Sequence, residues 1–129
     1  MGTTILIADD NSRLRTMIRR ISTQEPDLQV VGEAEDGAEA IRLAHLLRPD
    51  IVLMDLVMPR VNGLEAMRLI KMERPETKVI IITMHSEDAY RRTAEASGAD
   101  AFLLKKTLMT TLLPAIQSVR SSMSPPCTP

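Results

Sequence analysis

Five short apolar segments recur along the chain, and they constrain the fold more than any other feature. Four of them are nearly continuous runs of Ile, Leu, Val or Met, without the polar alternation of a sheet that has one wet face. Such runs indicate strands buried on both faces, which is typical of a parallel sheet. The segments are 4–8 (TILIA), 28–34 (LQVVGEA), 51–54 (IVLM), 78–82 (KVIII) and 101–104 (AFLL).

The segments between these runs have helical spacing and helix start or stop signals. Apolar stripes occupy the first and the last of them: Leu14, Met17, Ile18 and Ile21, then Leu112, Ile116, Val119 and Met123. Predicted helix caps are Asp36 with Glu39, Asn62 with Glu65, and Ser86, whose helix ends at Gly98. Strands alternating with helices predict an α/β fold, a (βα)5 doubly wound sheet with helices on both faces.

Polar residues follow the predicted strands where each strand ends. Asp9 and Asp10 follow the first strand, Asp55 the third, Thr83 the fourth and Lys105 the fifth. The carboxyl ends of parallel strands meet at one edge, so we expect these side chains to converge. Crowded carboxylates favour a hard cation, and Mg²⁺ fits best. Asp55, central in the cluster, can then attack a phosphoryl group to form an aspartyl phosphate.

Each of these residues also has an ordinary structural explanation. An Asp pair before a helix is most often a cap. Thr83 alone is a β-branched strand end, and Lys105 alone is a surface lysine. Complementary groups at four strand ends are much harder to explain in this way, so we interpret the set as a functional site.

The chain resembles the receiver domain of bacterial two-component response regulators. The resemblance covers about residues 4 to 121 and is carried by "ILIADDN", "IVLMDLVMPRVNGLEAM", "VIIIT" and "GADAFLLKK". The second of these, with Asp, Met-Pro and Asn-Gly at fixed offsets, is close to diagnostic. "VVGEAEDGAEAIRLA", together with a Lys that is not followed by Pro, resembles the NarL/LuxR-type branch most.

The resemblance implies the flavodoxin-like strand order 2-1-3-4-5 and a switch that a histidine kinase phosphorylates on Asp55. It implies that Asp10, Asp55 and the Val57 carbonyl hold Mg²⁺, with Asp9 acting mainly through water. Thr83 and Lys105 would bind the phosphoryl oxygens, and Phe102 matches the aromatic that swings inward with the threonine.

For the organisation of the chain, the resemblance implies a receiver domain at 1–121 and a tail or linker start at 122–129. Members of the branch usually continue into a DNA-binding domain, so we expect DNA contact only through an output domain that this chain lacks. A homodimer that forms on phosphorylation is compatible with the resemblance. Transcription regulation is the expected output.

Three residues depart from the family pattern. Met84 stands where a small residue is usual, which narrows access to the phosphoryl site. Lys106 replaces the usual proline, which makes a cis peptide there doubtful. Pro114 falls inside the last helical segment, so we expect that helix to begin near Thr110 or Thr111, or to be distorted in its first turn.

Rival functions find less support. The leading alternative is a constitutive interaction module with a silent phosphorylation site. An aspartyl-nucleophile enzyme of the haloacid-dehalogenase kind needs a second Asp where this chain has Val57, so we expect no enzyme. A flavodoxin-like nucleotide carrier needs a Gly-rich loop after the first strand, and none is present.

Composition excludes other classes. A formal net charge of −1 and 2% aromatic residues argue against direct binding of nucleic acid. The lone Cys127 has no partner for a disulfide, and no apolar run is long enough to cross a membrane, so we expect a cytoplasmic protein. His45 and His85 lack metal-ligand spacing: His45 is expected on a helix surface, and His85 can line the rim of the site.

Overall fold

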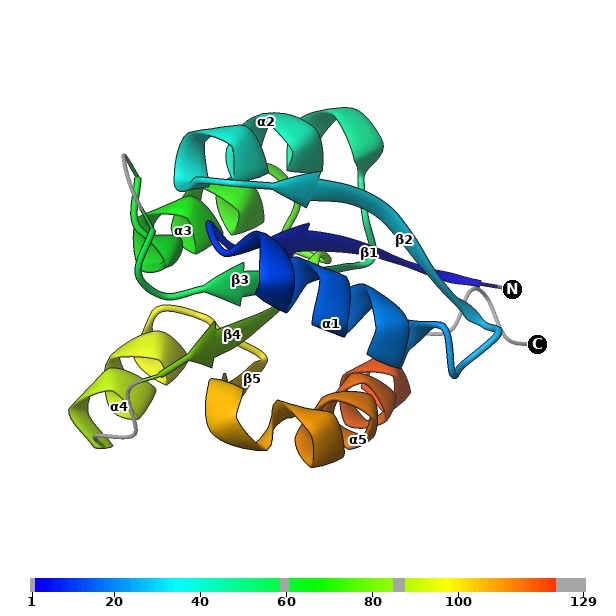
Figure 1. The fold of residues 1–129 in the computed structure, drawn as a ribbon. Helices are drawn as coiled ribbons and strands as arrows, with labels where there is room; N and C mark the ends of the chain where they lie inside the picture. Colours follow the sequence, from blue (N-terminus) through cyan, green and yellow to red (C-terminus); the bar gives the residue numbers. More distant parts are fainter. Residues whose placement is uncertain (1, 59–60, 85–87, 123–129) are drawn as a thin grey trace.

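The structure, a computed structural model, describes residues 2–58, 61–84 and 88–122. Its centre is a parallel sheet of five strands in the order β2-β1-β3-β4-β5, which confirms the predicted fold (Figure 1). The strands are β1 (Thr3–Ala8), β2 (Leu28–Ala34), β3 (Ile51–Asp55), β4 (Lys78–Thr83) and β5 (Ala101–Leu104). The strand order reverses between β1 and β3, the place where such folds bind ligands.

Helices cover both faces of the sheet (Figure 1). They are α1 (Ser12–Ser22), α2 (Gly37–Leu47), α3 (Gly63–Glu73), α4 (Asp88–Ala96) and α5 (Leu108–Ser121), with the 3-10 turn η1 (Lys105–Thr107) before α5. Helices α2, α3 and α4 contribute to one apolar core, and α1 and α5 contribute to the other. Among the described residues, no helix has the length and apolar character needed to cross a membrane.

The two cores explain why the strands read as continuous apolar runs. In β1, Leu6 and Ala8 point into the core with α2 and α3, while Ile5 and Ile7 point into the core with α1 and α5. All four are at most 1% exposed. Alternate side chains of a strand enter opposite apolar cores. Burial of each large apolar side chain contributes roughly 1.5–3 kcal/mol to the stability of the fold.

Helix starts follow the predicted capping residues where the structure describes them. Asp36 Oδ1 accepts a hydrogen bond from the Glu39 N–H at 2.8 Å, and Asn62 Oδ1 accepts one from the Glu65 N–H at 2.9 Å. Both caps were predicted. The predicted cap Ser86 lies outside the described residues. Beyond the end of α4, Gly98 adopts φ +110°, a conformation that favours glycine.

The predicted start of the last helix near Thr110 or Thr111 is wrong, and the alternative of a distorted first turn stays a prediction. Helix α5 begins at Leu108, before Thr110, and contains Pro114 in its interior. Pro114 and Thr110 are both exposed, so the Thr110 carbonyl that receives no N–H from the proline can bond water instead. The predicted apolar stripe is otherwise confirmed, since Leu112, Ile116 and Val119 are buried; Met123 lies outside the described residues.

Candidate functional site

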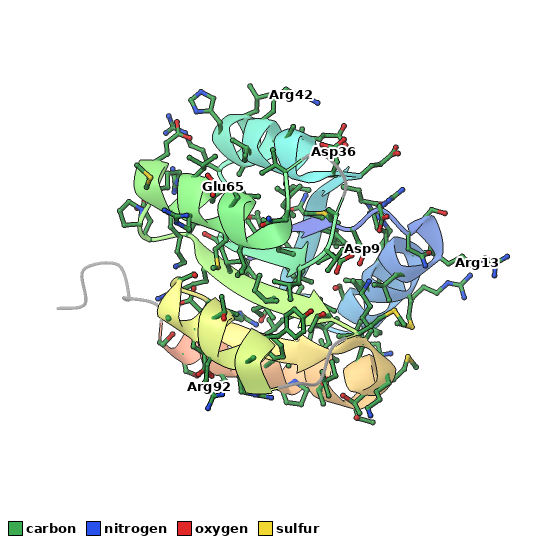
Figure 2. The ribbon with its side chains drawn as sticks, turned by 90° about the vertical axis from the view of Figure 1, so that its left-hand side faces the viewer. Asp9, Arg13, Asp36, Arg42, Glu65 and Arg92 are labelled. Carbon is green, nitrogen blue, oxygen red and sulfur yellow. The ribbon has the colours of Figure 1, made fainter. Side chains whose placement is uncertain are left out.

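Strand register brings the polar strand ends together. Ala8 of β1 pairs with Met54 of β3, so Asp9 and Asp55 follow side by side. Thr83 of β4 pairs with Leu104 of β5, directly before Lys105. Figure 2 looks onto this edge of the sheet and shows Asp9 near its centre, between α1 and α3. The predicted convergence of the strand ends is therefore present.

Three carboxylates form the acidic part of this edge. Asp9, Asp10 and Asp55 each offer one oxygen, and these oxygens lie within 4.8 Å of one another. Asp9 is 2% exposed and Asp55 5% exposed, whereas Asp10 is exposed. This donor set of oxygens, partly buried and open on one side, fits a hard divalent cation such as Mg²⁺.

The Lys105 ammonium offsets the buried carboxylates. Its Nζ lies 3.0 Å from Asp9 Oδ2 and 3.2 Å from Asp55 Oδ2. Burial alone would lower the pKa of Lys105, but the hydrogen bonds and charges of the two carboxylates outweigh burial and raise it. The lysine therefore stays charged, and its ammonium group contacts both Asp9 and Asp55.

Asp55 has the most perturbed carboxyl group of the site. Burial, and then the charge of Asp9, raise its pKa from the usual 3.8 to about 6, against the opposing influence of Lys105 and the Val57 N–H. At neutral pH most of this carboxylate is ionised, yet poorly solvated. A carboxylate in that state is a competent nucleophile for an electrophilic phosphorus.

The loop after β3 supports Asp55 in two ways. The Val57 N–H donates to Asp55 Oδ1 at 3.3 Å; the metal-ligating role predicted for the Val57 carbonyl stays a prediction. At Gly63, a Cβ would lie 2.0 Å from the Asp55 carbonyl oxygen. Only glycine allows α3 to start this close to the strand end, which explains the Asn-Gly pair physically.

A hollow of about 280 Å³ opens over Asp55. Its lining is Asp10, Asn11, Asp55, Val57, Thr83, Met84 and Lys105. Thr83 is 1% exposed, whereas the Met84 side chain is 79% exposed at the rim. The narrowing of the site by Met84 stays a prediction.

Phe102 does not line the hollow. It is 7% exposed and packs in the core that also contains Ala94 of α4. The guanidinium carbon of Arg91 lies 5.0 Å from the centre of its ring, a cation–π distance. The ring is buried in the one arrangement described, and the inward swing expected of Phe102 on phosphorylation stays a prediction.

Two residues that contact Asp9 were not identified from the sequence. Asn11, and not the Asp pair, caps α1: its Oδ1 accepts from the N–H groups of Arg13 and Leu14. Its own N–H donates to Asp9 Oδ1 at 2.8 Å. Asn before a helix is a standard cap signal and was available in the sequence. Arg15 is the second of these residues: it contacts the backbone of Asp9, and no local pattern marks it.

His45 takes no part in the described site. His45 Nδ1 contacts Glu73 Oε2 between α2 and α3, and its side chain is 61% exposed, as predicted for a helix surface. His85 and Cys127 lie outside the described residues. All peptide bonds of the described residues are trans, including the one before Lys106.

The doubly wound parallel sheet, with an acidic group and a lysine where the strand order reverses, has the arrangement that the resemblance to signalling receiver domains implies. Comparison with known families agrees: residues 5–117 match the response regulator receiver domain, and the chain belongs to this family. Receiver domains bind Mg²⁺ at an acidic site, and Asp9, Asp10 and Asp55 form an acidic group in this structure.

Relatives refine the assignment. The chain is 36% identical to the transcriptional regulatory protein DegU of Brevibacillus brevis over 115 residues, 89% of this chain and 49% of DegU. It is 36% identical to the response regulator GacA of Pseudomonas aeruginosa, over 89% of this chain and 54% of GacA. The chain thus spans about half the length of the curated relatives it matches.

Solved structures show the same fold. A LuxR-family two-component response regulator from Aurantimonas sp. SI85-9A1 aligns with a TM-score of 0.89 and 34% identity, over 94% of this chain and 86% of that one. The response regulator domain of Thermotoga maritima CheB aligns with a TM-score of 0.85 and 32% identity, over 97% and 100%. The LuxR-family match supports the NarL/LuxR-type branch.

Proposed function

We propose that this receiver domain accepts a phosphoryl group from a histidine kinase on Asp55 and changes its partner surface in response. The observation that carries the proposal is the position of Asp55: it ends β3, is 5% exposed, and lies 3.2 Å from the Lys105 ammonium. An Asp55 oxygen attacks phosphorus, the bond from phosphorus to the kinase histidine breaks, and the electron pair returns to the imidazole.

Asp9, Asp10, Asp55 and the Val57 carbonyl are the residues we propose to hold Mg²⁺. The cation, when bound, would neutralise charge on the transferred phosphoryl oxygens. Lys105, held between Asp9 and Asp55, supplies a second positive charge for those oxygens, and the Thr83 hydroxyl supplies a hydrogen bond. The chain lacks the second aspartate of aspartyl-nucleophile hydrolases, so we propose a phosphoacceptor and not an enzyme with external substrates.

Phosphorylation by a small donor tests the assignment. Acetyl phosphate with Mg²⁺ should add one phosphoryl mass to the wild type, read by intact-mass spectrometry, and none to Asp55→Asn. Asp50→Asn is the matched control, because Asp50 lies at the opposite ends of the strands, where it accepts from the Thr4 N–H. An Asp55→Asn variant that still gained the phosphoryl mass would contradict the assignment.

The alternative of a silent module with constitutive binding draws on one observation, the large Met84 side chain at the rim of the hollow. Beryllofluoride, a phosphoryl mimic, distinguishes the phosphorylation switch from the silent module. Amide chemical-shift changes around Asp55 on its addition support the switch, and unchanged spectra in the presence of Mg²⁺ support the silent module.

A groove of about 380 Å³ between α1 and the start of α5 is the surface we propose for the kinase. Met17, Ile21 and Met109 give it an apolar floor and edge, and Arg13 and Arg20 are exposed beside it. Figure 2 shows Arg13 projecting away from the body near the site edge. Apolar contact with a basic rim fits an amphipathic helix that carries acidic residues.

For the whole protein, we propose a transcription regulator, because relatives such as DegU are named as transcriptional regulators and are about twice as long as the match. DNA binding would then belong to a further domain. The limits 1–121 for the receiver and 122–129 for a tail, a phosphorylation-dependent homodimer and a cytoplasmic location are proposals that rest on the family alone.

A further inference from the structure

We propose that Arg15 is a positioning residue for the acidic site, acting through the backbone carbonyl of Asp9, and that Glu33 holds Arg15 in place. The inference rests on the proposed function and adds a support that links α1 and β2 to the metal ligands. Arg15 Nη1 donates to the Asp9 carbonyl oxygen at 2.6 Å. Arg15 Nε donates to Glu33 Oε1 at 2.9 Å, and the Arg15 side chain is only 12% exposed.

The Asp9 carbonyl controls more than Asp9. A peptide group is planar, so the Asp9 carbonyl and the Asp10 N–H share one rigid plane. A bond to the carbonyl oxygen therefore also restrains the direction in which the chain enters Asp10. Asp10 is exposed and leads into the loop before α1, so its carboxylate has no buried packing to orient it. The bond from Arg15 restrains the backbone from which this carboxylate projects.

The other polar atoms of Asp9 are bonded to different elements. Its N–H donates to the Ala34 carbonyl at 3.0 Å, Oδ1 accepts from the Asn11 N–H, and Oδ2 faces Lys105. The bond from Arg15 completes this set. Its loss would free the peptide after Asp9 while leaving the carboxylate of Asp9 anchored.

Glu33 makes the link rigid. Its Oε1 accepts from Arg15, and its Oε2 accepts from Arg19 Nε at 2.8 Å. Burial would raise the pKa of Glu33, but the hydrogen bonds and charges of Arg19 and Arg15 lower it, so the link remains charge-assisted. The ionised Glu33 is shared by Arg15 and Arg19, so it offsets only part of their positive charge. Loss of the Arg15 charge alone would favour a cation at the site, so weaker Mg²⁺ binding without Arg15 would report lost geometry.

Arg19 provides a matched control. It is an arginine of the same helix with the same glutamate partner, and its guanidinium bonds Glu33 without reaching the Asp9 carbonyl. Arg15→Met and Arg19→Met each remove one guanidinium from Glu33, and only Arg15→Met also removes the bond to Asp9. A difference between the two variants therefore reports the Asp9 contact.

The experiment measures Mg²⁺ affinity by NMR titration on folded wild type, Arg15→Met, Arg19→Met and Glu33→Gln. Outer residues that orient metal ligands typically change affinity by about 10–100-fold. We expect Arg15→Met to weaken Mg²⁺ binding by about tenfold, Glu33→Gln by less, and Arg19→Met by less than about twofold. Saturating Mg²⁺ should restore most of the acetyl phosphate labelling rate in Arg15→Met, a recovery that general destabilisation would not produce.

Equal Mg²⁺ affinity in Arg15→Met and Arg19→Met would overturn the inference. If Arg15→Met does not fold, Arg15→Lys takes its place: one ammonium cannot reproduce both bonds of the planar guanidinium, so it should also weaken Mg²⁺ binding, and wild-type affinity there would overturn the inference. Absence of Mg²⁺ binding or labelling in the wild type would instead contradict the proposed function, which keeps the two failures distinct.

Discussion

Asp55 sits in an environment that disfavours its own charge, and this environment makes stability depend on pH. Its pKa is about 6 in the folded protein and 3.8 ordinarily, so the fold binds the proton more tightly than the unfolded chain. Stability from this group is present below pH 3.8 and is lost as the pH rises through 6. Asp55→Asn should therefore stabilise the protein at pH 8 by up to about 3 kcal/mol, at about 1.4 kcal/mol per pKa unit.

Urea unfolding of wild type and Asp55→Asn at pH 4 and pH 8, without divalent cations, checks this expectation. The gain from Asn should be small at pH 4 and larger at pH 8. A gain that is the same at both pH values would mean that the carboxylate charge is not the source.

Lys105 competes with a metal ion for the same oxygens. Because its Nζ contacts Oδ2 of both Asp9 and Asp55, replacing it with Met removes a positive charge from the cation site. Lys105→Met should bind Mg²⁺ more tightly than wild type, by several-fold, and yet accept phosphoryl groups more slowly. Lys106→Met, at the exposed neighbouring position, is the control for a Mg²⁺ titration followed by NMR. Weaker Mg²⁺ binding in Lys105→Met would contradict the competition.

At the scale of helices and strands, the sequence predicted the features that depend only on neighbouring residues, such as helix caps. The caps Asp36 and Asn62 were predictable because a side-chain oxygen bonds an N–H three residues on. The start of α5 was not, because Leu108 is fully buried in the core shared with α1 and the helix begins there despite Pro114. Burial of an apolar side chain outweighed the local preference against an interior proline.

Helix α2 ends in a conformation that its sequence disfavours. Arg48 has φ 49° and ψ 56°, the left-handed region, and its N–H bonds to the Ala44 carbonyl. A residue with a Cβ is strained there, and glycine is not. The left-handed conformation costs a residue with a Cβ about 1–2 kcal/mol, and the greater entropy that glycine loses on folding costs about 0.5–1 kcal/mol, so Arg48→Gly should stabilise the protein by roughly 0.5–1 kcal/mol. The midpoint of urea unfolding measures the change, with Arg48→Ala as the control that removes the side chain and keeps the strain; equal midpoints for both variants would count against strain at this position.

For the whole molecule, the sheet and the site residues at its edge were predictable because parallel strands end together. The described arrangement confirms that Asp9, Asp10 and Asp55 meet there and that Lys105 reaches Asp9 and Asp55. The link from Glu33 through Arg15 to Asp9 was not predictable, because it depends on how α1 lies against β2. The sequence alone does not distinguish the arginines of α1 from one another. The packing shows that the Arg15 side chain is largely buried, whereas Arg13 is exposed.

We expect Thr83 to carry the effect of the proposed phosphorylation at Asp55 to the surface formed by α4 and β5. Thr83 is buried at the wall of the hollow, one strand away from β5, so a phosphoryl group on Asp55 can draw its hydroxyl toward the site. Because Phe102 is already buried under Arg91, we expect the response to come from a shift of β4 against α4 and β5, with little further burial of the ring. The phosphoryl group can shift the packing only through contacts that differ between the two states.

Thr83→Ala should therefore keep phosphorylation at Asp55 and lose most of the conformational response, while Thr83→Ser, which retains the hydroxyl, should keep both. Amide chemical shifts over residues 88–108, compared with and without beryllofluoride, measure the response, and intact mass measures phosphorylation. If Thr83→Ala responds as fully as the wild type, the coupling does not pass through this hydroxyl, and the contact between Arg91 and Phe102 becomes the next place to test it.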